Sequence, residues 1–68
     1  MKTLIEDDEL KRLRAMADGS KPFESAGLWE RIAALEWAEL KTLDARTRLG
    51  LGYYVAAKRR VEQMQEVA

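Results

Sequence analysis

Carboxylates are the first candidates for chemistry in this sequence, because they occur as near neighbours at two places. Asp7, Asp8 and Glu9 follow one another, and Glu36 and Glu39 stand three residues apart. The first group has the ligand type of a divalent cation site, and the second has that of an acid and base pair. However, adjacent residues of a helix point in different directions, and no EF-hand spacing follows the first group. We therefore expect a solvated helix start there and no metal site.

The side chains of nucleophilic catalysis are scarce. Ser20 and Ser25 are the only serines, and the chain has neither cysteine nor histidine. Without histidine, neither serine has an evident general base, and metal and thiol chemistry lose their usual ligands. Helix capping is the expected role of both serines. The sequence thus predicts a protein that is not an enzyme and that uses no cofactor.

Two glycines stand between basic clusters in the stretch "RTRLGLGYYVAAKRR", residues 46–60. Gly50 and Gly52 begin like a dinucleotide-binding fingerprint, but the third glycine position is Val55 and no strand is predicted before them. Two interpretations are left. Either the glycines end one helix and let the chain turn, or they lie within one helix and let another backbone come close.

A first helix is expected over about residues 4–17. Thr3 and Glu6 fit a capping box at its start, and acidic residues precede basic ones along it, as the helix dipole favours. Gly19 can take the left-handed conformation after its end, and Pro22 cannot continue it. A narrow apolar stripe marks its inner face, made of Leu10, Leu13, Met16 and Ala17.

A second, long helix is expected over about residues 22–66, with Pro22 in its first turn and Ser20 as its cap. Steps of three and four residues, the spacing of a coiled-coil seam, connect Trp29, Ile32, Glu36, Leu40, Leu43, Thr47, Gly50, Tyr54, Ala57, Val61, Met64 and Ala68. This spacing of three and four residues continues through Gly50 without a shift, which favours one continuous helix. A break near 50–52 is the alternative, because each interior glycine costs a helix about 1 kcal/mol.

The length of this second helix predicts self-association. At 1.5 Å per residue it would be roughly 65 Å long, far more than the first helix can cover. A chain of 68 residues without disulfides gains buried area most readily from a second copy. We therefore expect one all-α domain, residues 1–68, that forms a helical-bundle or coiled-coil-like homodimer, parallel or antiparallel. Its predicted interface comprises Trp29, Ile32, Leu40, Leu43, Gly50, Tyr54, Ala57, Val61 and Met64.

Further side chains are candidates for binding a partner. Tryptophan is over-represented among binding hot spots, which singles out Trp37 beside the seam. Basic residues surround two tyrosines and either pair with acids across a coiled-coil interface or bind a nucleic-acid backbone, with the tyrosines stacked on bases. These candidates are Arg46, Arg48, Tyr53, Lys58, Arg59 and Arg60, with Tyr54 the second tyrosine.

Composition narrows the class of function. Twelve basic and twelve acidic residues cancel, which argues against a surface that is attracted as a whole to nucleic acid or anionic lipid. No apolar run approaches the roughly 20 residues that span a bilayer, and the start "MKTLIEDDEL" turns acidic where a signal peptide turns apolar. We therefore expect a cytoplasmic protein without a membrane partner. Its leading predicted function is a non-enzymatic interaction module that binds and modulates a partner protein as a homodimer. The alternative is a small nucleic-acid-binding regulator that uses the basic residues of 46–60.

Overall fold

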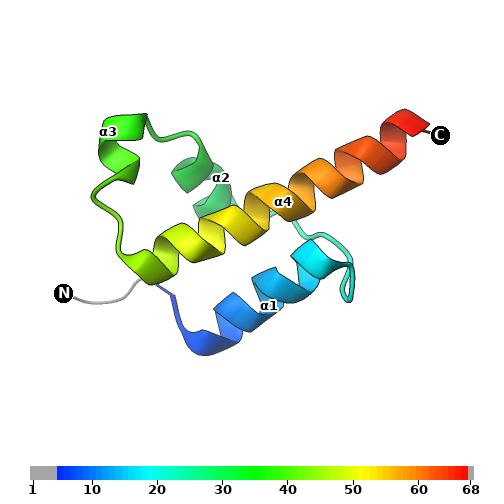
Figure 1. Ribbon diagram of the computed structural model, residues 1–68, viewed down its shortest axis with the longest axis horizontal. Helices are drawn as coiled ribbons and strands as arrows, with labels where there is room; N and C mark the ends of the chain where they lie inside the picture. The colour runs from blue at the N-terminus through cyan, green and yellow to red at the C-terminus, as the bar shows by residue number, and fades with distance from the viewer. Residues whose placement is uncertain (1–4, 68) are drawn as a thin grey trace.

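A computed structural model describes residues 5–67 of the chain, and this part is helical throughout apart from its connecting segments (Figure 1). In chain order its helices are α1 (Asp7–Asp18), α2 (Gly27–Ala33), α3 (Trp37–Leu40) and α4 (Ala45–Val67). No strand occurs among the described residues. The predicted all-α class is confirmed.

Helix α1 agrees closely with its prediction. It ends at Asp18, and Gly19 follows it in the left-handed conformation with a φ of 90°. The apolar stripe faces inward, with Leu13 and Met16 buried and Leu10 and Ala17 half-buried. The helix begins at Asp7, later than expected, and Glu6 precedes it in extended backbone without a capping hydrogen bond from its side chain. Thr3, the other member of the predicted capping box, lies outside the described residues.

The predicted long helix over 22–66 is wrong in its first half. A linker without regular structure, residues 19–26, connects α1 to α2, and Pro22 lies within it. Ser20 does not cap a helix; its backbone N–H donates to Asp18 Oδ1 at 2.8 Å. The linker is held instead by the helices around it, since the Ala26 N–H donates to the hydroxyl of Tyr54 at 3.2 Å.

The chain also leaves the helical conformation at 34–36 and at 41–44. Glu36 is extended, with a ψ of 158°, so the expected continuous seam is interrupted there. Thr42 donates its hydroxyl to the Glu39 carbonyl at 2.7 Å, the kind of local side-chain bond that competes with a continuing helix. Thr47, in the first turn of α4, donates its hydroxyl to the side chain of Asp44. The turn at 41–44 therefore falls where polar side chains bond to neighbouring groups.

At the two glycines the helix does continue. Helix α4 runs through Gly50 and Gly52 without a break, and Gly19 is the glycine with a positive φ among the described residues. Of the two interpretations of residues 46–60, the continuous helix is confirmed and the turn is wrong.

Helix α4 is the longest helix, and α1 and α2 pack against it (Figure 1). Helices α1 and α4 run side by side in the same direction: Asp7 Oδ1 lies 2.9 Å from Arg46 Nη1 near their starts, and the Arg60 guanidinium lies against Gly19 near the end of α1. Helix α2 packs on α4 as well. The last turns of α4 extend beyond the other helices (Figure 1).

Two aromatic residues occupy the centre of the core. Trp29 of α2 is 1% exposed and Tyr54 of α4 is fully buried, with ring centroids 6.2 Å apart in a stacked arrangement. Phe23 of the linker adds a tilted contact to Tyr54 at 5.3 Å. The other buried apolar side chains come from the segment before α1 and from α1, α2 and α4. They are Ile5, Leu13, Met16, Ile32 and Ala57.

At Gly50, core side chains from other parts of the chain come close to the backbone of α4. A Cβ atom placed on it would lie 2.7 Å from Cη2 of Trp29, 3.0 Å from Cδ1 of Ile5 and 3.2 Å from Cδ1 of Leu13. Real Cβ atoms essentially never come within 3.0 Å of a non-bonded heavy atom, so a side chain at this position would force its neighbours to shift. The close contact expected at Gly50 is present, and the groups that make it belong to the same chain.

Alanine substitutions at the two glycines are expected to change stability in opposite directions. Gly50→Ala drives a methyl group into the Trp29 ring, and overpacking of about 1–3 kcal/mol outweighs a helix-propensity gain of about 1 kcal/mol. Gly52 has no atom within 4 Å of its Cβ position, so Gly52→Ala gains the propensity alone. Urea unfolding followed by circular dichroism, at one protein concentration, measures both. Equal effects of the same sign would contradict the assigned packing.

Candidate interaction surfaces

The predicted interface residues divide into two groups in the structure. Five are buried within one chain and are already in contact with its own helices, namely Trp29, Ile32, Gly50, Tyr54 and Ala57. Leu40, Leu43 and Val61 are half-buried, and Met64 is 66% exposed. The seam spacing therefore identified a buried face correctly over 47–57. This buried face of α4 packs against α1 and α2 of the same chain. The predicted interface residues that stay exposed or half-buried on α4 lie at its end, at Val61 and Met64.

A polar cluster holds α2, the linker and α4 together beside the core. The Tyr54 hydroxyl donates to Glu30 Oε1 at 3.0 Å, and Lys58 Nζ donates to both oxygens of the same carboxylate at 3.0 and 3.1 Å. The Ser25 hydroxyl is a weaker donor to Glu30, at 3.5 Å. Hydrogen bonds from Lys58 and then Tyr54 hold the pKa of Glu30 below its ordinary value. Lys58, a candidate for partner binding, is thus engaged within the chain.

A second cluster joins α1 to α2. Trp29 Nε1 donates to Glu9 Oε1 at 3.2 Å, so the buried indole is satisfied at its polar end. Arg12 donates to the same carboxylate through two nitrogens and lies 3.6 Å from a Glu24 oxygen. The hydrogen bond from Arg12 lowers the pKa of Glu9, with Trp29 adding to the effect. One member of the acidic run is therefore a structural acceptor.

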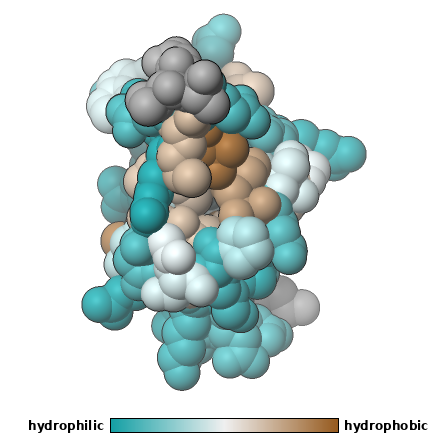
Figure 2. Space-filling view, turned by 90° about the vertical axis from the view of Figure 1, so that its right-hand side faces the viewer, coloured by the Kyte–Doolittle hydropathy of each residue, from teal (hydrophilic) through white to brown (hydrophobic). Residues whose placement is uncertain are grey.

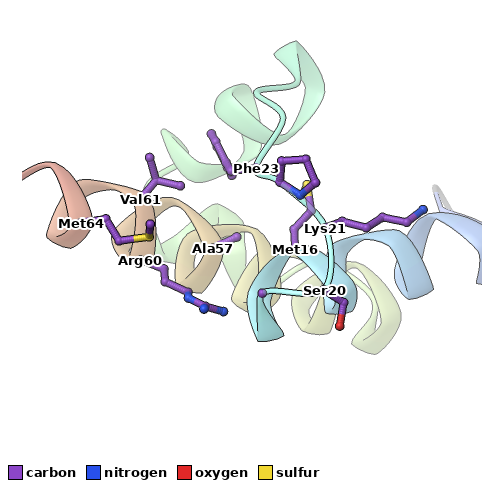
Figure 3. A pocket seen from close by; sticks show the side chains of 10 residues that line it. Met16, Ser20, Lys21, Phe23, Ala57, Arg60, Val61 and Met64 are labelled. Carbon is purple, nitrogen blue, oxygen red and sulfur yellow. The ribbon is translucent and has the colours of Figure 1, made fainter.

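An apolar groove lies at the end of the molecule from which α4 projects. We call it the C-terminal groove; it has a volume of about 340 Å³. Figure 2 shows apolar side chains gathered on this end of the molecule within a hydrophilic surround. Figure 3 shows side chains of α4 on one side of the groove and side chains of α1 and the linker on the other. Its apolar lining consists of Met16, Pro22, Phe23, Ala57, Val61 and Met64.

A second groove lies between α3 and the first half of α4, with a volume of about 350 Å³. We call it the Trp37 groove; it is lined by Trp37, Leu40, Lys41, Arg48, Leu51 and Gly52. Trp37 is 71% exposed, and the ammonium of Lys41 lies 5.8 Å from the centre of its ring. Trp37, predicted to contribute to a recognition surface, is thus brought together with Arg48 from the basic set.

The other basic candidates are spread along α4 and do not form one patch with the tyrosines. Arg46 is bound to Asp7, and the Arg60 side chain extends toward the linker and Gly19 (Figure 3). Arg59 is exposed. Tyr53 is half-buried against the core, and fully buried Tyr54 has no face free for stacking on a base.

Within the described part of the chain, no three carboxylates come close enough together to hold a metal ion. The same residues include no helix that is both long and apolar enough to cross a lipid bilayer. Both grooves are lined largely by apolar side chains, which makes them candidate binding surfaces.

Comparison with known proteins finds no similar protein. No protein-family description, no curated protein and no solved structure matches the chain.

The sequence pattern missed the two grooves as sites. Leu51 and Lys41 were not singled out, because each reads as an ordinary member of a helix. The signal that was present is the "TLDA" stretch at 42–45, in which threonine and aspartate favour a helix boundary. A break there folds α3 back beside α4 and brings Leu40 and Lys41 to one side of a groove.

The Glu30 cluster makes a specific prediction for the pH dependence of stability. Because the pKa of Glu30 is lowered on folding, its contribution is complete above the ordinary carboxyl pKa of about 4.3. That contribution is lost as the pH falls through the lowered value. Glu30→Gln keeps the shape and an acceptor but removes the charge, so the variant is less stable at pH 7 and its stability falls less on acidification. Urea midpoints measured from pH 7 to pH 2 test this.

The matched control is Glu39→Gln, which removes an exposed carboxylate from α3. The urea midpoint of Glu39→Gln is expected to fall with decreasing pH in the same way as that of the unmodified chain. Parallel curves for Glu30→Gln and the unmodified chain would show that the ion pair with Lys58 contributes nothing to stability.

Proposed function

We propose that this protein is a non-enzymatic interaction module that binds and modulates a partner protein and acts as a homodimer. The observation that carries the proposal is the exposure of Trp37 at the edge of an apolar groove. A tryptophan buries a large apolar area when it is covered, and such residues are frequent hot spots of protein interfaces. The groove flanked by Trp37 is accordingly the proposed partner site.

The homodimer is assigned to the C-terminal groove. Val61 and Met64 continue the spacing of three and four residues from Ala57, in the part of α4 that extends beyond the other helices. An isologous contact places the same patch of both copies face to face. Arg59 and Glu62 flank the patch with opposite charges, which complement each other when two α4 ends cross in antiparallel directions.

A second candidate function is nucleic-acid binding. It is supported by the exposure of Arg48, Arg59 and Arg60 on one helix. Ion pairs engage Arg46 and Lys58 within the chain, so fewer cations than the sequence suggested are free to contact phosphates. This reduces the expected number of phosphate contacts and makes protein binding the leading proposal.

The dimer is tested by a charge placed in the C-terminal groove. Met64→Glu puts a carboxylate on a 66% exposed side chain of the proposed interface, so the dimer is expected to dissociate at micromolar concentration while the helices stay folded. Gln63→Glu adds the same charge to the neighbouring exposed position and is expected to leave the dimer intact. Sedimentation equilibrium measures both. A monomeric unmodified chain would contradict the homodimer.

Partner binding is tested by capture from an extract of the native host, with and without nuclease. The unmodified chain is expected to retain a protein after nuclease treatment, and Trp37→Ala is expected to lose it. Leu28→Ala shortens another exposed apolar side chain, on α2, and is the matched control. Retention that disappears with nuclease would favour the nucleic-acid candidate, and retention that is indifferent to Trp37 would exclude the groove as the site.

A further inference from the structure

We propose that the Trp37 groove binds an acidic amphipathic helix of the partner protein. In this complex, apolar side chains of the helix contact Trp37, Leu40 and Leu51, and its carboxylates face Lys41 and Arg48. The inference rests on the proposed function and adds to it the chemical class of the ligand.

The shape of the groove suits side chains presented by a helix. Its volume of about 350 Å³ is at the small end of the roughly 300–1,000 Å³ found for ligand pockets. Along α4 the wall includes Gly52, where no atom lies within 4 Å of a Cβ position, so a partner can approach the backbone of α4 closely. Helices bind in such grooves through apolar anchors spaced three or four residues apart.

Trp37 is placed to act as one wall of this site. It is 71% exposed, whereas Trp29, the other tryptophan, is 1% exposed and donates to Glu9. Among residues 5–65, no acceptor is present for Trp37 Nε1. The largely exposed indole therefore offers apolar surface to an apolar side chain of a partner and an N–H that can donate to a partner's carboxylate.

The charges that line the groove determine which charge is favoured on the partner. Two cations, Lys41 and Arg48, and no acid are among the described residues that line the groove. Arg12, Arg46 and Lys58 form ion pairs with acids of the chain, but within residues 5–65 neither Lys41 nor Arg48 does so. A partner with carboxylates at the rim is thus favoured, and one with lysines there is disfavoured.

A membrane surface fits these observations less well than a helix does. The apolar side chains line a hollow between α3 and α4, whereas a bilayer takes up side chains that protrude from a convex face. Lipid-binding segments typically carry clusters of about four to eight basic residues, and this groove has two.

The experiment uses the full chain and two fluorescein-labelled helical peptides. Both carry leucines at positions spaced by three and four; one has glutamates along the rims of this stripe, and the other has lysines at the same positions. The glutamate peptide is expected to bind in fluorescence polarisation, and Trp37→Ala weakens this binding about 30-fold, the size of a hot-spot loss. The double variant Lys41→Glu and Arg48→Glu is expected to exchange the preference, so that the lysine peptide binds more tightly.

The matched control reverses two charges elsewhere, with Lys11→Glu and Arg14→Glu on the exposed side of α1, and is expected to keep the preference for glutamate. Circular dichroism checks that each variant is folded. Equal binding of the two peptides to the unmodified chain would overturn the acidic partner but leave the Trp37 groove as a site. Binding of neither peptide, or Trp37-dependent binding only to phosphatidylserine vesicles, would overturn the inference. The capture experiment decides the proposed function separately.

Discussion

The close contact between Gly50 and Trp29 is the constraint on which the rest of the fold depends. The chain of 68 residues forms a small core, and Trp29 reaches α4 there because Gly50 has no side chain of its own. The same contact brings Ile5 and Leu13 to α4, so it joins the segment before α1, α1 itself, α2 and α4 at one point. The helical cost of a glycine is offset by this burial, since an aromatic side chain buries a large apolar area.

Around this contact, the polar atoms of the two fully buried aromatic residues, Trp29 and Tyr54, each donate to an acid. Trp29 donates to Glu9, and Tyr54 donates to Glu30, while a base holds each of these carboxylates. Both acids lie at the margin of the core, where water reaches them, so the pairs avoid the full cost of burying charge. The two clusters thus connect α2 to both α1 and α4.

Local patterns in the sequence predicted the parts of the structure that depend on one helix alone. The apolar stripe of α1, the left-handed Gly19 and the uninterrupted course of α4 through Gly50 follow from periodicity and glycine chemistry. The spacing of three and four residues persists by coincidence across both breaks, at 34–36 and at 41–44. Good helix formers also hide the first break, and at the second the spacing conceals the boundary signal of Thr42 and Asp44. Of the candidate site, the sequence predicted Trp37, Leu40 and Arg48 as interaction residues. It could not show that they line one groove, because their proximity depends on how α3 folds against α4.

The opposite environments of the two tryptophans have a spectroscopic consequence. Trp29 is shielded from solvent and Trp37 is largely surrounded by it, so their emission differs in wavelength and in accessibility to a dissolved quencher such as acrylamide. A red-shifted, readily quenched component reports on the surface between α3 and α4, and a blue-shifted, protected component reports on the contact at Gly50. The chain therefore contains separate intrinsic optical reporters for occupancy of that surface and for integrity of its interior, without any added label.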